Sequence, residues 1–332
     1  MSNASLVWTK DLSVGYRSDG KKNVLFEKLN TSLNRGQLVC FMGPNGIGKS
    51  TLIRTLTGLQ KPLQGDVHYA EEGDTKGKRL PLKISVVLTD RIYANLTAQE
   101  VITYGRYPYL TWNLTLTDHD KQVIGQSMDY LRIKHLADKK VFELSDGQMQ
   151  MVMIARTLAQ DTPVILMDEP TAHLDLNNRV EIMNLLRMIA HEKQKAILVA
   201  THELDLALQT ADLIWLTGNN KDIITGIPED LVLNDSFDSI FRFKGFDLKT
   251  GKVQHALHQK ISVHLSGQGH PYLWTKNALE RNGYRADDLT SSVKIIIEDG
   301  VPLTWQLNNI KDTVTAASLE ELIKKLQTLK EQ

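Results

Sequence analysis

A glycine-rich octapeptide constrains the fold of this chain more than any other feature. Residues 43–50 read GPNGIGKS and fit the pattern G-x-x-x-x-G-K-[ST], in which a buried strand leads through a tight loop into a helix. The apolar run 38–42 supplies the strand, and a helix is expected over 50–57. Glycines let backbone N–H groups turn inward around phosphate oxygens, and the helix N-terminus adds positive potential. The motif therefore predicts a phosphate-binding loop at the end of a core strand.

Polar side chains in the motif and further along the sequence are expected to complete such a site. Lys49 is expected to hold the β- and γ-phosphates of a nucleotide, and the Ser50 hydroxyl is expected to face Mg²⁺. The apolar run 164–167 ends in Asp168 and Glu169, which places both carboxylates at the end of a predicted strand. Asp168 can reach Mg²⁺ through its water shell, and Glu169 is placed to polarise an attacking water as a general base. Two carboxylates after a strand also start helices or solvated turns, but the phosphate-binding loop favours the catalytic interpretation.

A third segment, Leu144–Gln148, predicts the start of a helix that continues to Gln160. Ser145 with Gln148 three residues later is a capping-box pattern, in which two side chains bond free N–H groups at the helix start. The simplest interpretation is a well-capped helix. The functional interpretation is an anion site formed by the Ser145 hydroxyl and the Gly147 N–H.

Alternating strands and helices predict an α/β core. Short apolar runs at 84–88 and 196–200 are typical of parallel strands that helices cover on both faces. The pattern of 182–189 is helical, and so is most of 97–160. Residues 70–82 are mostly polar and are expected to form a surface loop.

The pattern changes near 243–251, and a separate small α+β unit is expected beyond it. Its expected elements are strands at 260–265, 293–298 and 303–307 and helices at 273–282 and 318–329. Trp274 and Trp305 fit its apolar core. Four of the chain's ten histidines also fall here, namely His255, His258, His264 and His270. Their spacing fits no standard ligand set, so exposed or packed imidazoles and a metal-sensing site are both open interpretations.

Composition limits the class of protein. The chain has 332 residues, which suggests about two domains, and 39 Lys and Arg balance 39 Asp and Glu. A zero net charge argues against a protein that coats nucleic acid. No apolar stretch reaches the ~20 residues that span a bilayer, and the N-terminus lacks the layout of a secretion signal, so any membrane role is expected to run through a partner. The single cysteine, Cys40, excludes an intrachain disulfide framework and is expected in the core.

The segment LSDGQ at 144–148 resembles the LSGGQ signature of ATP-binding cassette (ABC) ATPases. Residues 5–240 carry the motifs of that family in the family's order. The resemblance implies the α/β fold of an ABC-type P-loop ATPase, with a RecA-like core, an antiparallel β subdomain and an α-helical subdomain at about 92–160. We therefore expect an ABC ATPase domain at 1–245 and an accessory C-terminal α+β domain of unknown role at 246–332.

The resemblance also implies roles for single residues, with ATP and Mg²⁺ as ligands. Tyr16 matches the aromatic residue that stacks on adenine, Asp175 matches the loop that links the two sites of a dimer, and His202 matches the switch histidine at the γ-phosphate. Glu169 and His202 are the implied catalytic residues. The implied nucleotide-binding residues are Tyr16, Gly43, Asn45, Gly46, Gly48, Lys49, Ser50, Thr51, Ser145, Gly147, Gln148 and Asp175. The implied Mg²⁺ ligands are Ser50, Asp168 and Asp90.

Two positions depart from the family pattern. The family usually has Gln just after the strand at 84–88, whereas this chain has Thr89 and Asp90, and we hypothesise that the Asp90 carboxylate reaches Mg²⁺ directly or through water. Asp146 replaces the first glycine of the signature; a carboxylate in the first turn suits the helix dipole, so it is expected to point away from bound phosphate or to pair with a cation.

The resemblance implies how the subunits assemble. In the family, a head-to-tail homodimer holds two ATP molecules, each between Lys49 of one subunit and Ser145 and Gly147 of the other. Hydrolysis of the γ-phosphate then removes part of what joins the subunits.

The segment EVITYGRYPY at 100–109 resembles ATPases of iron–siderophore, haem and cobalamin importers, in which this region contacts the membrane subunits. The expected partners are integral-membrane permease subunits and, indirectly, a periplasmic or lipoprotein substrate-binding protein, and the expected location is the cytoplasmic face of the membrane. The simpler interpretation of Gly105, Arg106 and Pro108 is a helix ended by Gly and Pro.

Other functions are weighed against this one. A soluble ABC-type ATPase acting on the ribosome or on nucleic acid usually has two cassettes or a long coiled coil, and this sequence contains neither. A non-hydrolysing regulatory module is disfavoured because Glu169 and His202 are present. Export is open beside import, because the membrane partner sets the direction.

Overall fold

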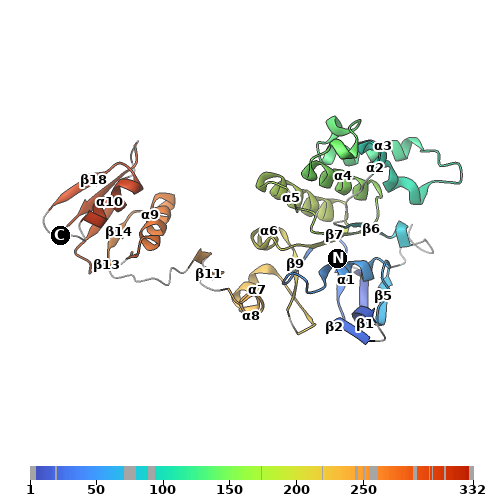
Figure 1. Cartoon of the computed structure of the whole chain (residues 1–332), viewed down its shortest axis with the longest axis horizontal. Helices are drawn as coiled ribbons and strands as arrows, with labels where there is room; N and C mark the ends of the chain where they lie inside the picture. Colours follow the sequence, from blue (N-terminus) through green and yellow to red (C-terminus); the bar gives the residue numbers. More distant parts are fainter. Residues whose placement is uncertain are drawn as a thin grey trace. The chain divides into compact units, whose positions relative to one another are not determined.

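The computed structural model describes residues 5–18, 21–70, 80–88, 94–172, 174–218, 220–243, 246–249, 251–253, 261–286, 290–298, 300, 302–309 and 312–328. The chain divides into two compact units, Met1–Arg242 and Phe243–Gln332 (Figure 1), and each is described by itself. In the part of the chain that is described, no helix combines the length and the apolar character needed to cross a bilayer.

The first unit is built on a sheet of six strands in the order β10-β9-β4-β8-β7-β6. The strands are β4 (Leu38–Met42), β6 (Ile84–Val87), β7 (Val164–Asp168), β8 (Ala196–Ala200), β9 (Leu213–Thr217) and β10 (Ile223–Gly226). All neighbours are parallel except β10, which is antiparallel to β9. Every residue of β4, β7 and β8 is buried, as the apolar runs 38–42, 164–167 and 196–200 require, and the burial includes Asp168 at the end of β7. Cys40 of β4 is among them, and burial raises the pKa of its thiol to about 12.

Helices pack on this sheet, and a second sheet lies beside it. The helices are α1 (Lys49–Leu56), α5 (Leu176–Glu192), α6 (Leu204–Thr210), α7 (Pro228–Leu233) and α8 (Ser236–Phe241). The antiparallel second sheet contains β1 (Ser5–Ser18), β2 (Lys21–Leu29), β3 (Ser32–Asn34) and β5 (Gln64–Tyr69), with β1 paired to the other three. Phe26 of β2 and Leu52 of α1 meet Phe41 of β4 in one shared core, which fixes the second sheet against the phosphate-binding loop.

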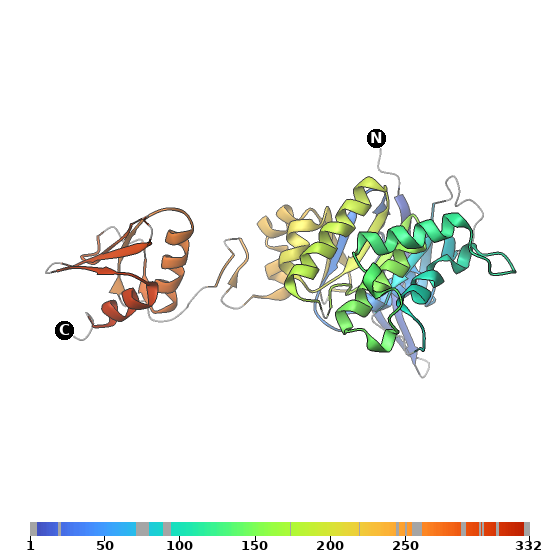
Figure 2. The same cartoon turned by 90° about the horizontal axis from the view of Figure 1, so that it is seen from above.

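A layer of helices is inserted between β6 and β7. It contains α2 (Ala98–Thr103), η3 (Tyr104–Tyr109), α3 (Asp118–Tyr130), η4 (Lys134–Leu136), η5 (Val141–Glu143) and α4 (Asp146–Ala159). Seen from above, the green helices of this layer lie over the strands (Figure 2). Capping boxes start α2 at Thr97, α3 at Thr117 and α4 at Ser145. The α/β class with an antiparallel β subdomain and a helical subdomain is therefore confirmed.

Arg106 holds this helical layer together. The residue is 3% exposed, its Nε donates to Asp120 Oδ1 of α3 at 2.7 Å, and its Nη1 donates to the Ala159 carbonyl of α4 at 3.0 Å. Its guanidinium also lies 4.0 Å from the centre of the Tyr109 ring. The neighbouring Gly105 is required because a Cβ there would lie 2.3 Å from the Arg156 carbonyl oxygen. Arg106 is thus an internal tie and presents no surface to a partner.

The second unit is an α+β fold. Its main sheet has the order β14-β16-β17-β18, formed by His264–Ser266, Lys294–Glu298, Thr304–Asn308 and Thr313–Ala316. Two helices, α9 (Gly269–Arg281) and α10 (Leu319–Thr328), complete a core with Ile295 and Leu307. Short strands pair as β11 (Phe246–Asp247) with β12 (Lys252–Val253) and as β13 (Ile261–Ser262) with β15 (Tyr284–Arg285). The strand expected over 260–265 is therefore two strands with different partners.

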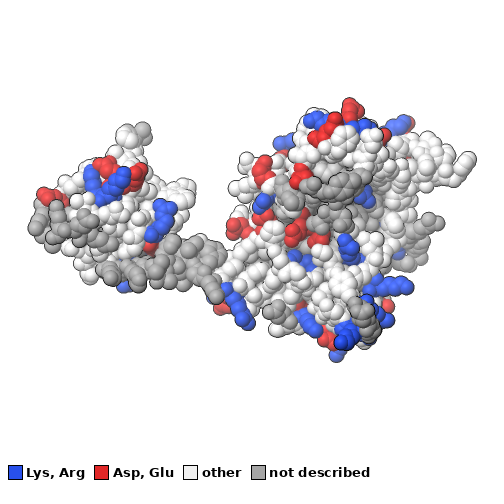
Figure 3. All heavy atoms as spheres, viewed as in Figure 1, with Lys and Arg blue, Asp and Glu red and all other residues white. Residues whose placement is uncertain are grey.

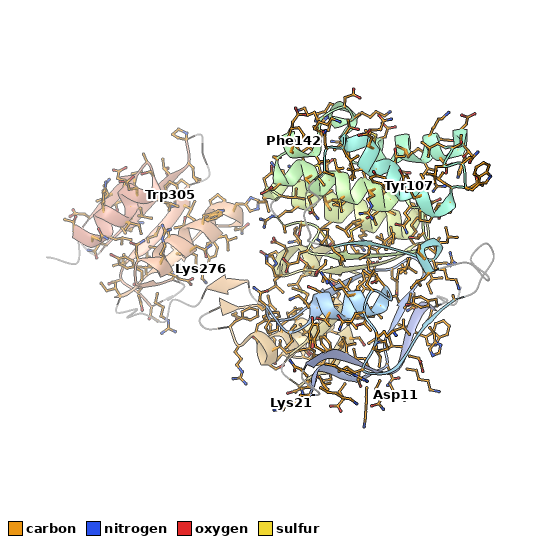
Figure 4. All side chains as sticks on the ribbon, turned by 45° about the vertical axis from the view of Figure 1, so that its right-hand side comes forward. Asp11, Lys21, Tyr107, Phe142, Lys276 and Trp305 are labelled. Carbon is orange, nitrogen blue, oxygen red and sulfur yellow. The ribbon has the colours of Figure 1, made fainter. Side chains whose placement is uncertain are left out.

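The two tryptophans of this unit have opposite environments. Trp305, labelled in Figure 4, is 6% exposed, as expected. Its Nε1 donates to Thr275 Oγ1 at 2.8 Å. Trp274 is 64% exposed, so the expectation that it lies in the core is wrong. The buried face of α9 is Thr275, Ala278 and Leu279, a spacing of three and four, and Trp274 lies one position off that face.

Candidate functional site

The loop between β4 and α1 has the backbone that a phosphate cradle needs. Gly46 and Gly48 adopt φ values of +76° and +112°, in the left-handed region that L-residues rarely enter. A Cβ on Gly48 would also lie 2.9 Å from Leu25 Cδ1, so a larger residue would be strained twice. Helix α1 begins at Lys49, and its first N–H groups have no partner within the helix. This end of α1 therefore suits an anion.

Lys49 is held inside the loop. Its side chain donates through Nζ to the Gly43 carbonyl at 2.9 Å and to the Pro44 carbonyl at 3.2 Å. Burial lowers the pKa of Lys49, and the nearby charges of Glu169 and Asp168 oppose that shift. An ammonium group has three N–H donors, so a third can point to a phosphate oxygen while two hold the loop. Lys49 and the loop at 43–50 therefore fit the phosphates of a nucleoside triphosphate.

The two carboxylates stand across from the loop at the end of β7. Asp168 is 3% exposed; burial raises its pKa, and a hydrogen bond with the Ser50 side chain acts in the opposite direction. A hydroxyl beside a carboxylate provides the hard oxygen ligands that Mg²⁺ takes, so the pair fits that ion. Glu169 has a φ of +49°, and its N–H donates to the Ala200 carbonyl of β8 at 2.9 Å. Strand β8 thus holds Glu169 in an uncommon backbone conformation, as is frequent at functional sites.

His202 follows β8 and meets the same carboxylate. Its Nδ1 lies 3.3 Å from Glu169 Oε1, and its side chain is 52% exposed. These groups surround a cavity of about 690 Å³. The cavity is lined by Tyr16, Asn23, Leu25, Asn45, Gly46, Gly48, Lys49, Ser50, Thr51, Asp168, Glu169 and His202. Ten of these twelve are residues that the sequence indicated. Their roles remain predictions, but the fold brings them into one place.

The β1–β2 pair forms one wall of the cavity. Tyr16 of β1 is 47% exposed, and its hydroxyl forms a hydrogen bond with the Thr51 side chain of α1. Tyr16 faces Asn23 of β2 in the strand register, and Leu25 is two residues further on. Sequence reasoning missed Asn23 and Leu25. The available signal was the alternation of β2, which places both on the same side of the strand.

The signature residues lie elsewhere in the chain's fold. The capping box is confirmed, since Gln148 N–H donates to Ser145 Oγ and Ser145 N–H donates to Gln148 Oε1, each at 3.2 Å. Asp175 caps α5, accepting from Asn178 N–H at 2.8 Å. Within the described residues, Ser145, Gly147, Gln148 and Asp175 do not line the cavity around Lys49, and Gly43 does not line it either but accepts a hydrogen bond from Lys49. The expected nucleotide-binding set is thus divided between two places in one chain.

Two expectations involve residues that the structure does not describe. Asp90 and Thr89 lie outside the described residues, and the replacement of the usual Gln by Asp90 stays a prediction. Of the four clustered histidines, His255 and His258 are also outside them. His264 Nε2 lies 3.0 Å from Ser266 Oγ, and no group of three or more His, Cys, Asp or Glu that could hold a metal occurs in the ranges described.

Comparison with known proteins agrees with this geometry. The family model "ABC transporter" matches residues 26–172, and the model "Iron ABC transporter C-terminal domain" matches residues 259–327. An uncharacterized ABC transporter ATP-binding protein of Methanocaldococcus jannaschii is 38% identical over 271 residues, which are 78% of this chain and 91% of that protein. The chain belongs to the ABC transporter ATP-binding proteins.

This ABC protein has further relatives. The petrobactin import ATP-binding protein of Bacillus subtilis is 32% identical over 246 residues, covering 73% of this chain and 94% of that protein. A bacterial ABC transporter cassette solved as a dimer superposes with a TM-score of 0.59 at 26% identity, covering 67% of this chain and 99% of the cassette. The resemblance deduced from LSDGQ is confirmed, and so is the class of enzyme, an ATPase that couples ATP hydrolysis to transport.

Proposed function

We propose that this ABC protein is the ATP-hydrolysing subunit of an importer at the cytoplasmic face of the membrane, and that its cargo is an iron–siderophore, haem or cobalamin. The observation that carries the ATPase role is the cavity in which Lys49, Asp168, Glu169 and His202 converge. The cargo class is supported by the match of 259–327 to an iron transporter domain and by the petrobactin importer relative.

Each group of the cavity has a proposed role. Lys49 and the N-terminus of α1 bind the β- and γ-phosphates, and Tyr16 stacks on adenine. Ser50 and Asp168 hold Mg²⁺, which neutralises phosphate charge when it is bound. Glu169 accepts the proton of the attacking water. Its 3.3 Å contact with His202 keeps the imidazole beside the γ-phosphate position.

A homodimer follows from the division of the site. The cavity around Lys49 lacks the Ser145 hydroxyl and the Gly147 N–H, and the N-terminus of α4 is well placed to receive an anion from another copy. The dimeric cassette among the structural relatives supports this arrangement. We propose that each ATP lies between the loop at 43–50 of one subunit and α4 of its partner.

We propose that the permease docks on the helical layer near η3. Arg106 and Gly105 are internal, so the contact must come from their exposed neighbours. Tyr107, labelled in Figure 4, is 47% exposed. Trp112 is 95% exposed and Leu114 is 63% exposed. Large apolar side chains in water are typical of an interaction surface. Acidic and basic side chains are interspersed over the face seen in Figure 3, which favours a protein partner over nucleic acid.

We also propose that 1–245 acts as the ATPase domain and that 246–332 is an accessory domain. Support comes from the two compact units and from the separate family match of 259–327. A substrate-binding protein would act with the permease and would not touch this chain.

The test is Glu169→Gln. We expect it to keep ATP binding, to slow hydrolysis by about 10² or more, and to trap an ATP-bound dimer. The matched control is Glu192→Gln, which makes the same change from carboxylate to amide at an exposed residue at the end of α5. This variant should hydrolyse ATP at the wild-type rate. An unchanged rate in Glu169→Gln contradicts the assignment of the base.

The cargo is tested by uptake of labelled ferric siderophore, haem or cobalamin into vesicles that contain the permease. Co-purification with ribosomes would instead support a soluble ABC-type ATPase that acts on the ribosome.

A further inference from the structure

A chain of polar contacts runs from His202 to the loop that starts α5. His202 Nε2 lies 3.8 Å from Glu203 Oε1, and the same Glu203 oxygen lies 2.5 Å from Arg179 Nη1. Arg179 Nε donates to the Leu174 carbonyl at 2.7 Å. None of these contacts involves the residues that the sequence motifs identified, apart from His202. They join two loops that are far apart in the chain.

Arg179 uses the two sides of its guanidinium for two different loops. It lies on α5, one turn after the cap at Asp175, and it bonds back to the carbonyl just before that cap. Its other edge pairs with Glu203, whose own N–H donates to Thr201 Oγ1 at 3.0 Å. The side chains of Arg179 and Glu203 are 32% and 20% exposed, so the pair is partly shielded from water. Arg179 therefore connects the Leu174 carbonyl to the Glu203 carboxylate through two hydrogen bonds.

The charges around His202 explain what this bridge can do. The imidazole stands between two carboxylates, with Glu169 3.3 Å from Nδ1 and Glu203 3.8 Å from Nε2. The Glu203 oxygen that faces Nε2, Oε1, is also the oxygen that accepts the hydrogen bond from Arg179. Without Arg179, that carboxylate would attract Nε2 and would add a negative charge beside the phosphate site. Both effects would oppose a bond from Nε2 to a phosphate oxygen.

We propose that Arg179 and Glu203 are a positioning pair for His202. Arg179 neutralises Glu203, so that Nε2 of the imidazole turns to the γ-phosphate, and the Leu174 carbonyl holds Arg179 in the orientation that this requires. The inference rests on the proposed function, because it assumes that His202 meets the phosphate.

The test compares Arg179→Met, Glu203→Gln and the double variant of the full chain in steady-state ATPase assays. Arg179→Met should lower kcat by about tenfold or more while KM for ATP changes less than about twofold. Glu203→Gln removes the competing charge and keeps the shape, so its kcat should stay within about threefold of wild type. The double variant should recover to the level of Glu203→Gln. Such recovery would not occur if the pair were only a structural brace.

Two further variants separate the possible failures. Arg132 pairs at 3.2 Å with Glu181, which lies on α5 as Arg179 does, but the Arg132 side chain is 82% exposed. Arg132→Met should therefore leave kcat unchanged. His202→Ala should abolish most hydrolysis. Suppose that His202→Ala is inactive, as expected. If the double variant or Glu203→Gln is then as slow as Arg179→Met, the positioning pair is refuted while the proposed function stands. If His202→Ala hydrolyses ATP normally, the proposed role of His202 itself is refuted.

Discussion

Replacing Arg106 with methionine should destabilise the helical layer by about 3–5 kcal/mol, because the change leaves a buried carboxylate without its cation. The structure supports a value in this range. The arginine is 3% exposed, bonds Asp120 and the Ala159 carbonyl at 2.7 and 3.0 Å, and covers the Tyr109 ring. Methionine fills much of the same volume but replaces neither bond, so the loss is electrostatic and not a packing defect.

Hydrogen exchange measures this loss locally, which is suitable for a chain of two units. In Arg106→Met, amides of α2, α3 and the end of α4 should exchange faster by the factor that corresponds to the lost free energy, whereas amides of β16 and β17 should not change. Arg132→Met is the matched control, because its ion pair with Glu181 is exposed and should contribute less than about 1 kcal/mol. A loss under about 1 kcal/mol in Arg106→Met would refute the account of a buried tie.

The same ion pair predicts a dependence on pH. Burial alone would raise the pKa of Asp120, but hydrogen bonds from Thr117 and from Arg106 outweigh it and lower the pKa from 3.8 to about 2. Since the folded pKa is depressed, the contribution is complete above about pH 4 and is lost as the pH falls through 2, and it amounts to about 2 kcal/mol. Asp120→Asn should lack this part of the acid transition, although it is less stable at pH 7.

Other parts of the structure give three shorter predictions. Lys49→Met should weaken ATP binding by at least about tenfold in a calorimetric titration, and unaltered affinity would show that the loop does not hold the phosphates. Trp305→Phe should destabilise the second unit by about 1–3 kcal/mol in urea, because the Thr275 hydroxyl loses its buried donor at 2.8 Å; an equal midpoint would contradict this. Cys40 should resist iodoacetamide at pH 8 in the native state and react in guanidinium, since burial raises its pKa to about 12; rapid native labelling would show that β4 opens.

Much of the site could be predicted because its parts are local in sequence. The loop at 43–50, the carboxylates after 164–167 and the Ser145 cap each depend on a few consecutive residues and on the element next to them. Continuous apolar runs identify β4, β7 and β8 because buried parallel strands need apolar residues on both faces. Strand ends meet at one edge of the sheet, which brings Lys49, Asp168 and His202 together without further information.

The missed features depend on contacts between distant segments. Arg179 and Glu203 are 24 positions apart, and either could equally be a solvated helix residue when the sequence alone is considered. Arg106 is an opposite case. The sequence singles out Gly105, Arg106 and Pro108 only by resemblance or as the end of a helix, whereas Arg106 is buried against Asp120 and α4, which no short pattern reveals. Edge strands such as β10 alternate too weakly in sequence to be separated from loops.

The position of Arg106 bears on how docking and catalysis communicate. Helix α4 begins at the Ser145 cap and ends at Ala159, which Arg106 binds, so one rigid rod of about 21 Å joins the signature to η3. The exposed Tyr107 extends from η3 itself, and the exposed Trp112 follows three residues after its end. Under the proposed docking, a permease that displaces these side chains cannot bend η3 alone, because the buried bonds of Arg106 would be broken first. The displacement would therefore move α4 as a body, and with it, in the proposed dimer, the Ser145 hydroxyl relative to the phosphate that the partner subunit would hold.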